Sequence, residues 1–204
     1  MKQTLFELFL LMSMSSCMRI AYKIQGVHPP KLESVKSIYS FCKKHDIDTI
    51  QTRIMGWGNF LENIQKNNSK DLLFDQNGVL VAYSVSFGNS SCSQNIVTTI
   101  SSIVPKSFLP RDSSITLQKE SLKWRFLNDT SKVVEINPEG EDYTIVTYWN
   151  MYAGKPNHIK RFEKLKAAKA TNSNIKFRHI YVNQDFRDDM DLELKSKFGT
   201  KKKK

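Results

Sequence analysis

The stretch that decides the fold covers residues 143–185, and its centre reads Tyr148-Trp149-Asn150-Met151-Tyr152-Ala153-Gly154-Lys155-Pro156-Asn157. Residues 143–149 form a β-rich, largely apolar run, which is typical of a central strand. Residues 157–170 carry apolar side chains at helical spacing, and residues 176–182 favour a second strand. The order of strand, tight loop, helix and strand predicts a βαβ unit with a short loop ahead of its helix.

The residues before this unit predict a second small α/β unit, with elements in the order βαβαββα. In chain order we expect a strand over 19–26, a helix over 31–45, a strand over 47–54, a helix over 56–67, strands over 72–75 and 79–85, and a helix over 93–104. Asn77-Gly78 favours a tight hairpin turn. The first helix has an expected apolar stripe of Val35, Ile38, Tyr39 and Cys42.

The two units are separated by a segment rich in turn signals. Pro105 and Pro110 mark residues 105–112 as a linker. The expected organisation is a signal peptide (1–16), an N-terminal α/β unit (17–104), the linker, a C-terminal unit (113–200) and a basic tail (201–204). Within the C-terminal unit we further expect a hairpin of residues 124–127 with 132–136, a turn at 137–140 and a helix over 188–198. The fold class is therefore α/β.

The composition is that of a globular protein with an uneven charge. The chain has 204 residues, of which 40% are hydrophobic and 25% charged, and its formal net charge is +11. Residues 155–204 hold 15 Lys and Arg against 6 Asp and Glu, so most of the excess lies in the last quarter. A basic surface attracts nucleic acid or anionic surfaces, but no base-reading motif accompanies it. We expect a solvated helix face and tail, and not a nucleic-acid partner.

The N-terminus has the pattern of a secretory signal. A Lys near the start precedes an apolar run, Leu8-Phe9-Leu10-Leu11-Met12, which is too short to span a bilayer. Ser15-Ser16-Cys17 resembles a bacterial lipobox, which implies cleavage before Cys17 and attachment of lipid to its thiol. The resulting protein would be a membrane-anchored lipoprotein of the cell envelope, facing the periplasm. The alternative is a first helix of a cytosolic domain, in which Cys17 is an ordinary buried thiol.

The two remaining cysteines are Cys42 and Cys92. Cys42 lies on the expected apolar stripe of a helix, so we predict a buried and inert thiol. Cys92 lies in a polar turn and is expected to be exposed, without a neighbouring basic residue that would lower its pKa. The two could form a disulfide in an oxidising compartment, but the sequence does not supply the geometry.

Residues 143–199 resemble the first half of a thioredoxin domain of the membrane-anchored periplasmic kind. Thr147-Tyr148-Trp149 resembles the strand-ending Phe-Trp of that family, and Ala153-Gly154-Lys155-Pro156 resembles its Cys-Gly-Pro-Cys. Tyr181-Val182-Asn183-Gln184-Asp185 resembles its Val-Asn-x-Asp. The family's cis-proline and its final hairpin and helix would follow residue 204. The unit is therefore either truncated or completed by the first half of the chain, and the whole is similar to small lipoproteins of Bacteroidetes-type bacteria.

The catalytic groups of this family are missing. A redox thioredoxin needs a thiolate at the start of the helix, and the matching positions here are Ala153 and Pro156. His28, His45, His158 and His179 lack metal-ligand spacing, and a lone His158 near a helix start is expected to be a cap or a solvent contact. Asp185, Asp188, Asp189 and Asp191 lack the Gly and Glu of a calcium loop and are expected to be helix-start carboxylates. No metal or cofactor is expected.

Three functional hypotheses follow. The first is a non-catalytic thioredoxin-fold lipoprotein that binds a protein partner through residues 149–156, with Trp149 and Tyr152 as aromatic anchors. In an equally weighted alternative, these two rings only close the core. The second hypothesis is a thiol-disulfide oxidoreductase that uses Cys42 and Cys92. The third is a binder of anionic surfaces or nucleic acid through the basic C-terminal quarter.

Overall fold

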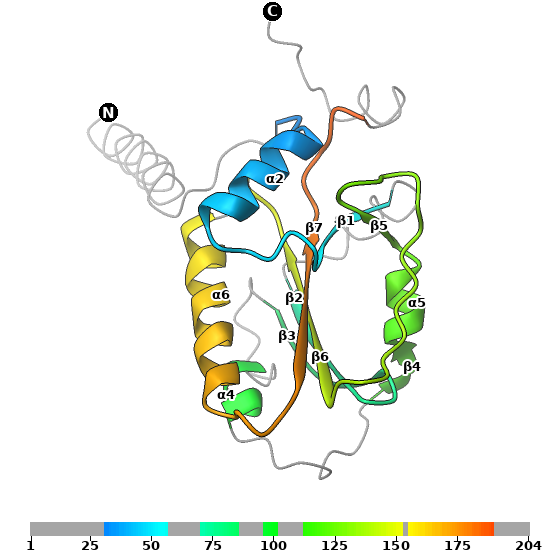
Figure 1. The fold of residues 1–204 in the computed structure, drawn as a ribbon, viewed down its shortest axis with the longest axis vertical. Helices are drawn as coiled ribbons and strands as arrows, with labels where there is room; N and C mark the ends of the chain where they lie inside the picture. Colours follow the sequence, from blue (N-terminus) through cyan, green and yellow to red (C-terminus); the bar gives the residue numbers. More distant parts are fainter. Residues whose placement is uncertain (1–30, 57–69, 86–95, 102–111, 153–154, 190–204) are drawn as a thin grey trace, which may run out of the picture.

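The computed structural model describes residues 31–56, 70–85, 96–101, 112–152 and 155–189. These residues form an α/β fold with one curled, seven-stranded mixed sheet in the order β4-β3-β2-β6-β7-β1-β5 (Figure 1). The strands are β1 (Thr52–Met55), β2 (Lys70–Asp75), β3 (Val79–Val85), β4 (Asp112–Thr116), β5 (Trp124–Phe126), β6 (Tyr143–Trp149) and β7 (Phe177–Asn183). The helices are α2 (Val35–Lys44), α4 (Ile96–Ser101), α5 (Leu117–Ser121) and α6 (Lys155–Ala170).

The predicted βαβ unit is confirmed as β6, α6 and β7. The two strands are parallel and in register from Tyr143 opposite Phe177 to Trp149 opposite Asn183. All seven residues of β6 are buried. The reason is visible in Figure 1, where α2, α4 and α6 lie on one side of the sheet and α5 on the other. A strand covered on both faces needs the continuous apolar and β-branched run that the sequence has at this place.

The predicted hairpin is confirmed as β2 and β3. Gly78 has a positive φ of 72°, and the Asp75 carboxylate accepts hydrogen bonds from the backbone N–H groups of Asn77 and Val79, both at 2.9 Å. The hairpin's β2 pairs antiparallel with β6, and Leu73 lies opposite Ile145. On the other side of the βαβ unit, β1 pairs parallel with β7. Strands that the sequence assigned to two units therefore lie in a single sheet.

Helix α2 is shorter than predicted, and its buried face differs from the expected stripe. The hydroxyl of Ser34 caps its N-terminus by accepting a hydrogen bond from Ser37 N (3.0 Å). Ile38, Phe41 and Cys42 are buried, which is the i, i+3, i+4 pattern of one helix face. Tyr39, predicted to point inward, is 40% exposed because it lies about 100° around the helix from Ile38.

Two other predictions are corrected, and one helix was not predicted. The strand expected over residues 47–54 is confined to Thr52–Met55, because the Asp48 carboxylate turns the chain by accepting hydrogen bonds from Ile50 N and Gln51 N. Strand β5 pairs with β1, and the hairpin partner predicted at 132–136 is reduced to one bridge between Arg125 and Val133. Helix α5, capped by Thr116, was not predicted.

Several predicted segments lie outside the described residues. These are the signal peptide, Cys17, the strand over 19–26, residues 57–67 of the second helix, Cys92, and nearly all of the linker and of the helix over 188–198. In the part of the chain that is described, no helix is long and apolar enough to cross a membrane.

The core has three parts that follow the layers of the fold. On the side of α4 and α6, Leu73, Ile100 and Leu165 pack together with other apolar residues. On the side of α5, Trp124 and Tyr148 belong to a second cluster. A third cluster lies between α2, α6 and the end of β6 and is built around Trp149.

Candidate functional site

The carboxyl ends of the three parallel strands β1, β6 and β7 meet at one edge of the sheet. The segments that follow β6 and β7 are residues 150–152 and 184–187. In open α/β sheets this edge is the usual place for a ligand site, because loops diverge there and helices begin there. We refer to residues 149–152 and 183–187 together as the strand-end edge. It contains residues 149–152 of the segment 149–156, which was predicted as a possible binding surface.

Asp185 holds the strand-end edge together. Its buried carboxylate accepts two hydrogen bonds from the backbone N–H of Met151, at 2.8 and 3.0 Å, and one from the side-chain amide of Asn183, at 2.6 Å. Asp185 N in turn donates to the Asn183 side-chain oxygen (3.1 Å), and Gln184 N donates to Trp149 O (2.7 Å). The loop after β6 is thus fastened to the end of β7 by a charged group. Asp185 does not start a helix, which corrects its predicted role.

Trp149 is a core residue in this structure. Its side chain is fully buried and stacks on Phe41, with ring centroids 5.0 Å apart, while Phe162 meets it edge-on at 6.0 Å. The indole Nε1 makes no hydrogen bond to the described residues. Of the two interpretations left open by the sequence, Trp149 therefore follows the one in which the ring closes the core. Asn150 is buried as well.

The partly exposed side chains of the loop are Met151 and Tyr152. Tyr152 packs against Phe186 with ring centroids 6.0 Å apart. Burial, assisted by the charge of Asp185, raises the pKa of Tyr152 to about 12, so its hydroxyl stays protonated at neutral pH. Lys155 and Pro156 are the first two residues of α6, a place where proline is tolerated. Ala153 and Gly154 lie outside the described residues.

Arg187, the buried cation of the strand-end edge, was not predicted from the sequence. Its Nη1 donates to Met55 O at the end of β1 (2.9 Å), and its Nε pairs with Asp189 (2.9 Å). Burial lowers the pKa of Arg187, and the nearby carboxylates of Asp189 and Asp188 oppose that shift. The signal that was available was a polar run, Asn183 to Asp185, directly after a buried strand, followed by an arginine.

Two buried histidines, His158 and His179, lie near the strand-end edge and pack in the interior of the fold. His158 was expected to be a cap or a solvent contact, but it is buried and stacks on Phe162 with ring centroids 6.4 Å apart. His179 Nε2 lies 2.8 Å from Thr147 Oγ1. Burial, with the charges of Lys169 and Arg161, lowers the pKa of His179 well below its usual range, so the ring is neutral. Among the described residues no group of three His, Cys, Asp or Glu side chains could hold a metal ion.

Cys42 is buried in the core, as predicted. Its thiol lies 3.8 Å from Thr52 Oγ1. Burial raises the pKa of Cys42 from its ordinary value of 9.0 to about 11. Since the thiolate is the reactive form, this thiol lacks the property that a redox nucleophile requires.

Native Cys42 is therefore expected to resist thiol reagents. The test uses a Cys17→Ser/Cys92→Ser variant at pH 8. A pKa of about 11 in place of 9.0 lowers the thiolate fraction of Cys42 about 100-fold. The aromatic disulfide DTNB should therefore react with the native protein at least about 100-fold more slowly than with the urea-unfolded chain. The absorbance of the released thiolate measures both rates. Equal rates in native buffer and in urea would contradict the buried position.

A second buried polar cluster lies under α5. The Tyr148 hydroxyl donates to Glu120 Oε2 (2.5 Å), Trp124 Nε1 donates to the Tyr148 oxygen (3.2 Å), and Lys123 pairs with Glu120. Burial by itself would raise the pKa of Glu120, but hydrogen bonds from Lys123 and Tyr148 and the charge of Lys70 outweigh it, so the pKa lies below its ordinary value. The cluster is buried and fully hydrogen-bonded, which indicates a structural role.

Glu120 is expected to make stability depend on pH. Because its pKa is lower in the folded state than in the unfolded chain, its ionised form stabilises the fold above the ordinary value of 4.5, and this contribution is lost as the pH falls through the lowered folded value. Urea unfolding should therefore show Glu120→Gln clearly less stable than wild type at pH 7, with a smaller difference at pH 3. The exposed Glu163→Gln serves as the control. A difference that is the same at both pH values would argue against this role.

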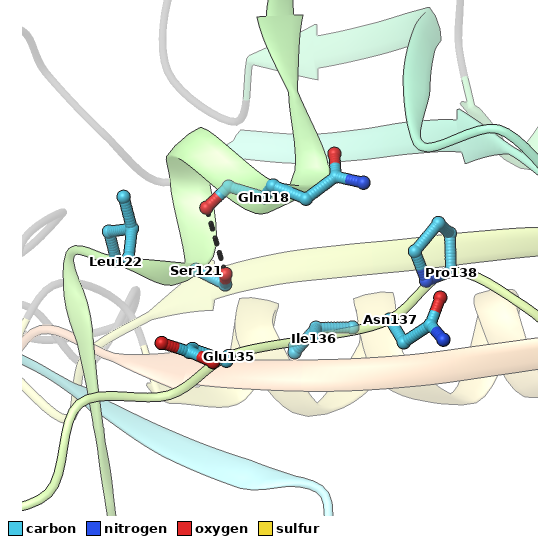
Figure 2. Close-up of a pocket in the computed structure, with 7 residues that line it drawn as sticks. All are labelled: Gln118, Ser121, Leu122, Glu135, Ile136, Asn137 and Pro138. Carbon is cyan, nitrogen blue, oxygen red and sulfur yellow. Dashed lines mark hydrogen bonds between the residues drawn. The ribbon is translucent and has the colours of Figure 1, made fainter.

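A surface cavity of about 560 Å³ lies beside α5. Figure 2 shows its lining, in which the side chains of α5 face the segment 135–138. The Ser121 hydroxyl donates to Gln118 O (2.9 Å). The lining residues are Gln118, Ser121, Leu122, Glu135, Ile136, Asn137 and Pro138. The Ser121 hydroxyl is thus bonded to a backbone oxygen and not to Glu135, the carboxylate of this lining, so the arrangement does not activate Ser121 as a nucleophile.

The comparisons with known proteins add no family to this description. No protein-family model matches the chain, and neither a curated protein nor a solved structure matches it significantly.

Proposed function

We propose that this protein is a non-catalytic, thioredoxin-like lipoprotein of the cell envelope that binds a protein partner at the strand-end edge. The observation that carries the proposal is the clamp formed by Asp185, whose carboxylate accepts the Met151 N–H of the loop after β6 and the Asn183 side-chain amide at the end of β7. A rigid loop loses little conformational entropy on binding, and this favours recognition of a partner. Met151 and Tyr152 would supply the contact surface.

The topology of the sheet supports the thioredoxin-like part of the proposal. A thioredoxin domain has a hairpin and a helix in addition to its βαβ unit. The hairpin of β2 and β3, which pairs antiparallel with β6, is followed by α4. Helix α4 contacts α6, and Asn172 Nδ2 donates to Ile100 O across that contact (2.7 Å). The first half of the chain would thus complete the domain.

The residues at the family's catalytic positions and the burial of Cys42 favour binding over redox catalysis. Ala153 and Pro156 have no thiol at the family's catalytic positions. Cys42 is buried and its pKa is raised to about 11 by that burial. We therefore expect the purified protein not to accelerate the reduction of insulin disulfides by dithiothreitol above the rate of a buffer blank. Turnover that disappears in a Cys42→Ser/Cys92→Ser variant would favour the oxidoreductase hypothesis instead.

Site-specific cross-linking tests the binding surface. A photoreactive benzoylphenylalanine replaces Tyr152 in one variant and Val133, which is 43% exposed outside the strand-end edge, in another. We expect a discrete adduct in intact cells from position 152 and none from position 133. In membrane extracts, excess purified wild-type protein should suppress this adduct because it competes for the partner. The same excess of a Tyr152→Ala variant should not suppress it. Equal adducts from both positions, or suppression by both competitors, would refute the proposed surface.

The location is tested separately through Cys17. If lipid on Cys17 anchors the protein, wild type should sediment with membranes, and Cys17→Ser should be soluble or unprocessed. Mass spectrometry of the N-terminus distinguishes a lipidated Cys17 from an intact Met1. A soluble wild-type protein that retains Met1 would exclude the lipoprotein assignment and leave the binding surface to be judged by cross-linking.

A further inference from the structure

A cavity of about 440 Å³ lies at the amino end of β1, whereas the strand-end edge lies at its carboxyl end. Its lining comes from α2, from the turn before β1, and from the end of β5 and the residues after it. The cavity is within the size range of small-molecule sites. Because the cavity and the strand-end edge lie at opposite ends of β1, the cavity is separate from the surface of the proposed function. Its test does not depend on that proposal.

The polar centre of this cavity is Arg53. Only 9% of its surface is exposed. Its Nη1 donates to the backbone oxygens of Ile50 (2.5 Å) and Thr52 (3.0 Å), and its guanidinium lies over the Phe126 ring, 4.9 Å from the centroid. These contacts fix the orientation of the side chain. Nε is buried and makes no hydrogen bond to the described residues, and no carboxylate among them forms an ion pair with Arg53.

The charges around Arg53 leave it incompletely compensated. Asp48 attracts it, but one oxygen of that carboxylate already accepts the N–H groups of Ile50 and Gln51. Arg178 is close enough to repel it. A buried guanidinium without a carboxylate is costly, and an anion that binds to it removes this cost. The free edge of one guanidinium matches the two oxygens of a carboxylate.

The walls of the cavity are apolar and partly open to solvent. Tyr39 is 40% exposed and Ile50 is 78% exposed, while Phe126 is half-buried. Tyr39 and Ile50 are two of the four exposed large hydrophobic side chains among the described residues. A cation at the base and exposed aromatic and aliphatic side chains at the rim fit a ligand that is anionic at one end and apolar at the other.

We propose that this cavity binds a small organic carboxylate with an aromatic body. The carboxylate accepts hydrogen bonds from those guanidinium N–H groups of Arg53 that do not bond to Ile50 O or Thr52 O. The ring of the ligand packs between Tyr39 and Phe126. Among the described residues of the lining, Arg53 is the one charged side chain, which favours a singly charged carboxylate over a phosphate, and the Thr52 hydroxyl is already engaged with Asp48 O (2.7 Å).

Titration of the ¹⁵N-labelled protein with 3-phenylpropionate tests the site, with 3-phenylpropionamide as the uncharged control. We expect saturable shifts of the Arg53 and Phe126 amide signals below 10 mM carboxylate, and at least about tenfold weaker binding of the amide, because a charge-assisted hydrogen bond is lost. Arg53→Met should weaken carboxylate binding at least about tenfold, and the exposed Lys164→Met should not change it.

Three results would overturn the proposal. These are the absence of a saturable shift, equal affinity for the amide, and unchanged affinity in Arg53→Met. If Arg53→Met does not fold, Tyr39→Ala replaces it, since Tyr39 lies on the exposed side of α2. That variant should bind the carboxylate several-fold more weakly, and unchanged affinity would likewise overturn the proposal.

Discussion

Replacing Trp149 with alanine is expected to lower the free energy of unfolding by about 3–5 kcal/mol, since removing a large core ring leaves a cavity. The indole is fully buried between Phe41 and Phe162, at the point where α2, α6 and the end of β6 meet. A loss of this size is a large fraction of the total stability of a typical domain, so much of the variant should be unfolded or aggregated at 37 °C. Urea unfolding followed by circular dichroism measures the difference.

The conservative variant separates packing from polar effects at Trp149. Trp149→Phe keeps a ring in the cluster and removes an Nε1 group that makes no hydrogen bond to the described residues, so we expect a loss of about 1–2 kcal/mol. Leu122→Ala is the surface control, because Leu122 is 54% exposed. If Trp149→Ala were as stable as Leu122→Ala, Trp149 would have to be an exposed loop residue, as the anchor hypothesis required.

Replacing Asp185 with alanine is expected to cost about 2–4 kcal/mol of folding free energy, since charged hydrogen bonds are lost and a partly buried N–H keeps no partner. The N–H is that of Met151, which points at both carboxylate oxygens. The loop after β6 should then open more often. We expect amide hydrogen exchange at Met151 to become faster than in wild type, by a larger factor than exchange in the middle of β6.

Asp185→Asn tests the charge with little change in shape. Its side-chain oxygen can still accept from Met151, but its amide group would oppose the Asn183 amide that now donates to Asp185 at 2.6 Å. An intermediate loss is expected. The exposed Glu163→Ala controls for removal of a carboxylate and should stay within about 0.5 kcal/mol of wild type. Unchanged exchange at Met151 in Asp185→Ala would show that the clamp does not hold the loop.

Elements with strong local signals were predicted closely. The strand over Tyr143–Trp149 has the predicted bounds, because its continuous apolar run leaves few alternatives to a buried strand. Helix α6 begins at Lys155, two residues before the predicted start, and ends at Ala170 as predicted. Prediction failed where one contact decided the outcome, as at Asp48, whose carboxylate shortens β1 by binding two backbone N–H groups.

The candidate site was predicted only in part. The sequence placed the loop 149–156 between a strand and a helix, and the structure confirms this for its described residues. The burial of Trp149 depends on Phe41, which is more than 100 residues away in the chain, so no local pattern distinguishes an anchor from a core residue. The roles of Asp185 and Arg187 depend in the same way on Met151 and on Met55 O.

The sequence by itself determined the α/β class, the βαβ unit, the hairpin at Asn77-Gly78 and the lack of thiols at Ala153 and Pro156, because period, turn chemistry and residue type are local properties. Only the tertiary structure decided that β2 pairs with β6 and β1 with β7, which merges both halves of the chain into one sheet. Strand pairing across about 70 residues or more, such as Leu73 with Ile145, depends on which apolar faces fit together when the chain is compact. A sequence pattern of period two marks such faces but does not name their partners.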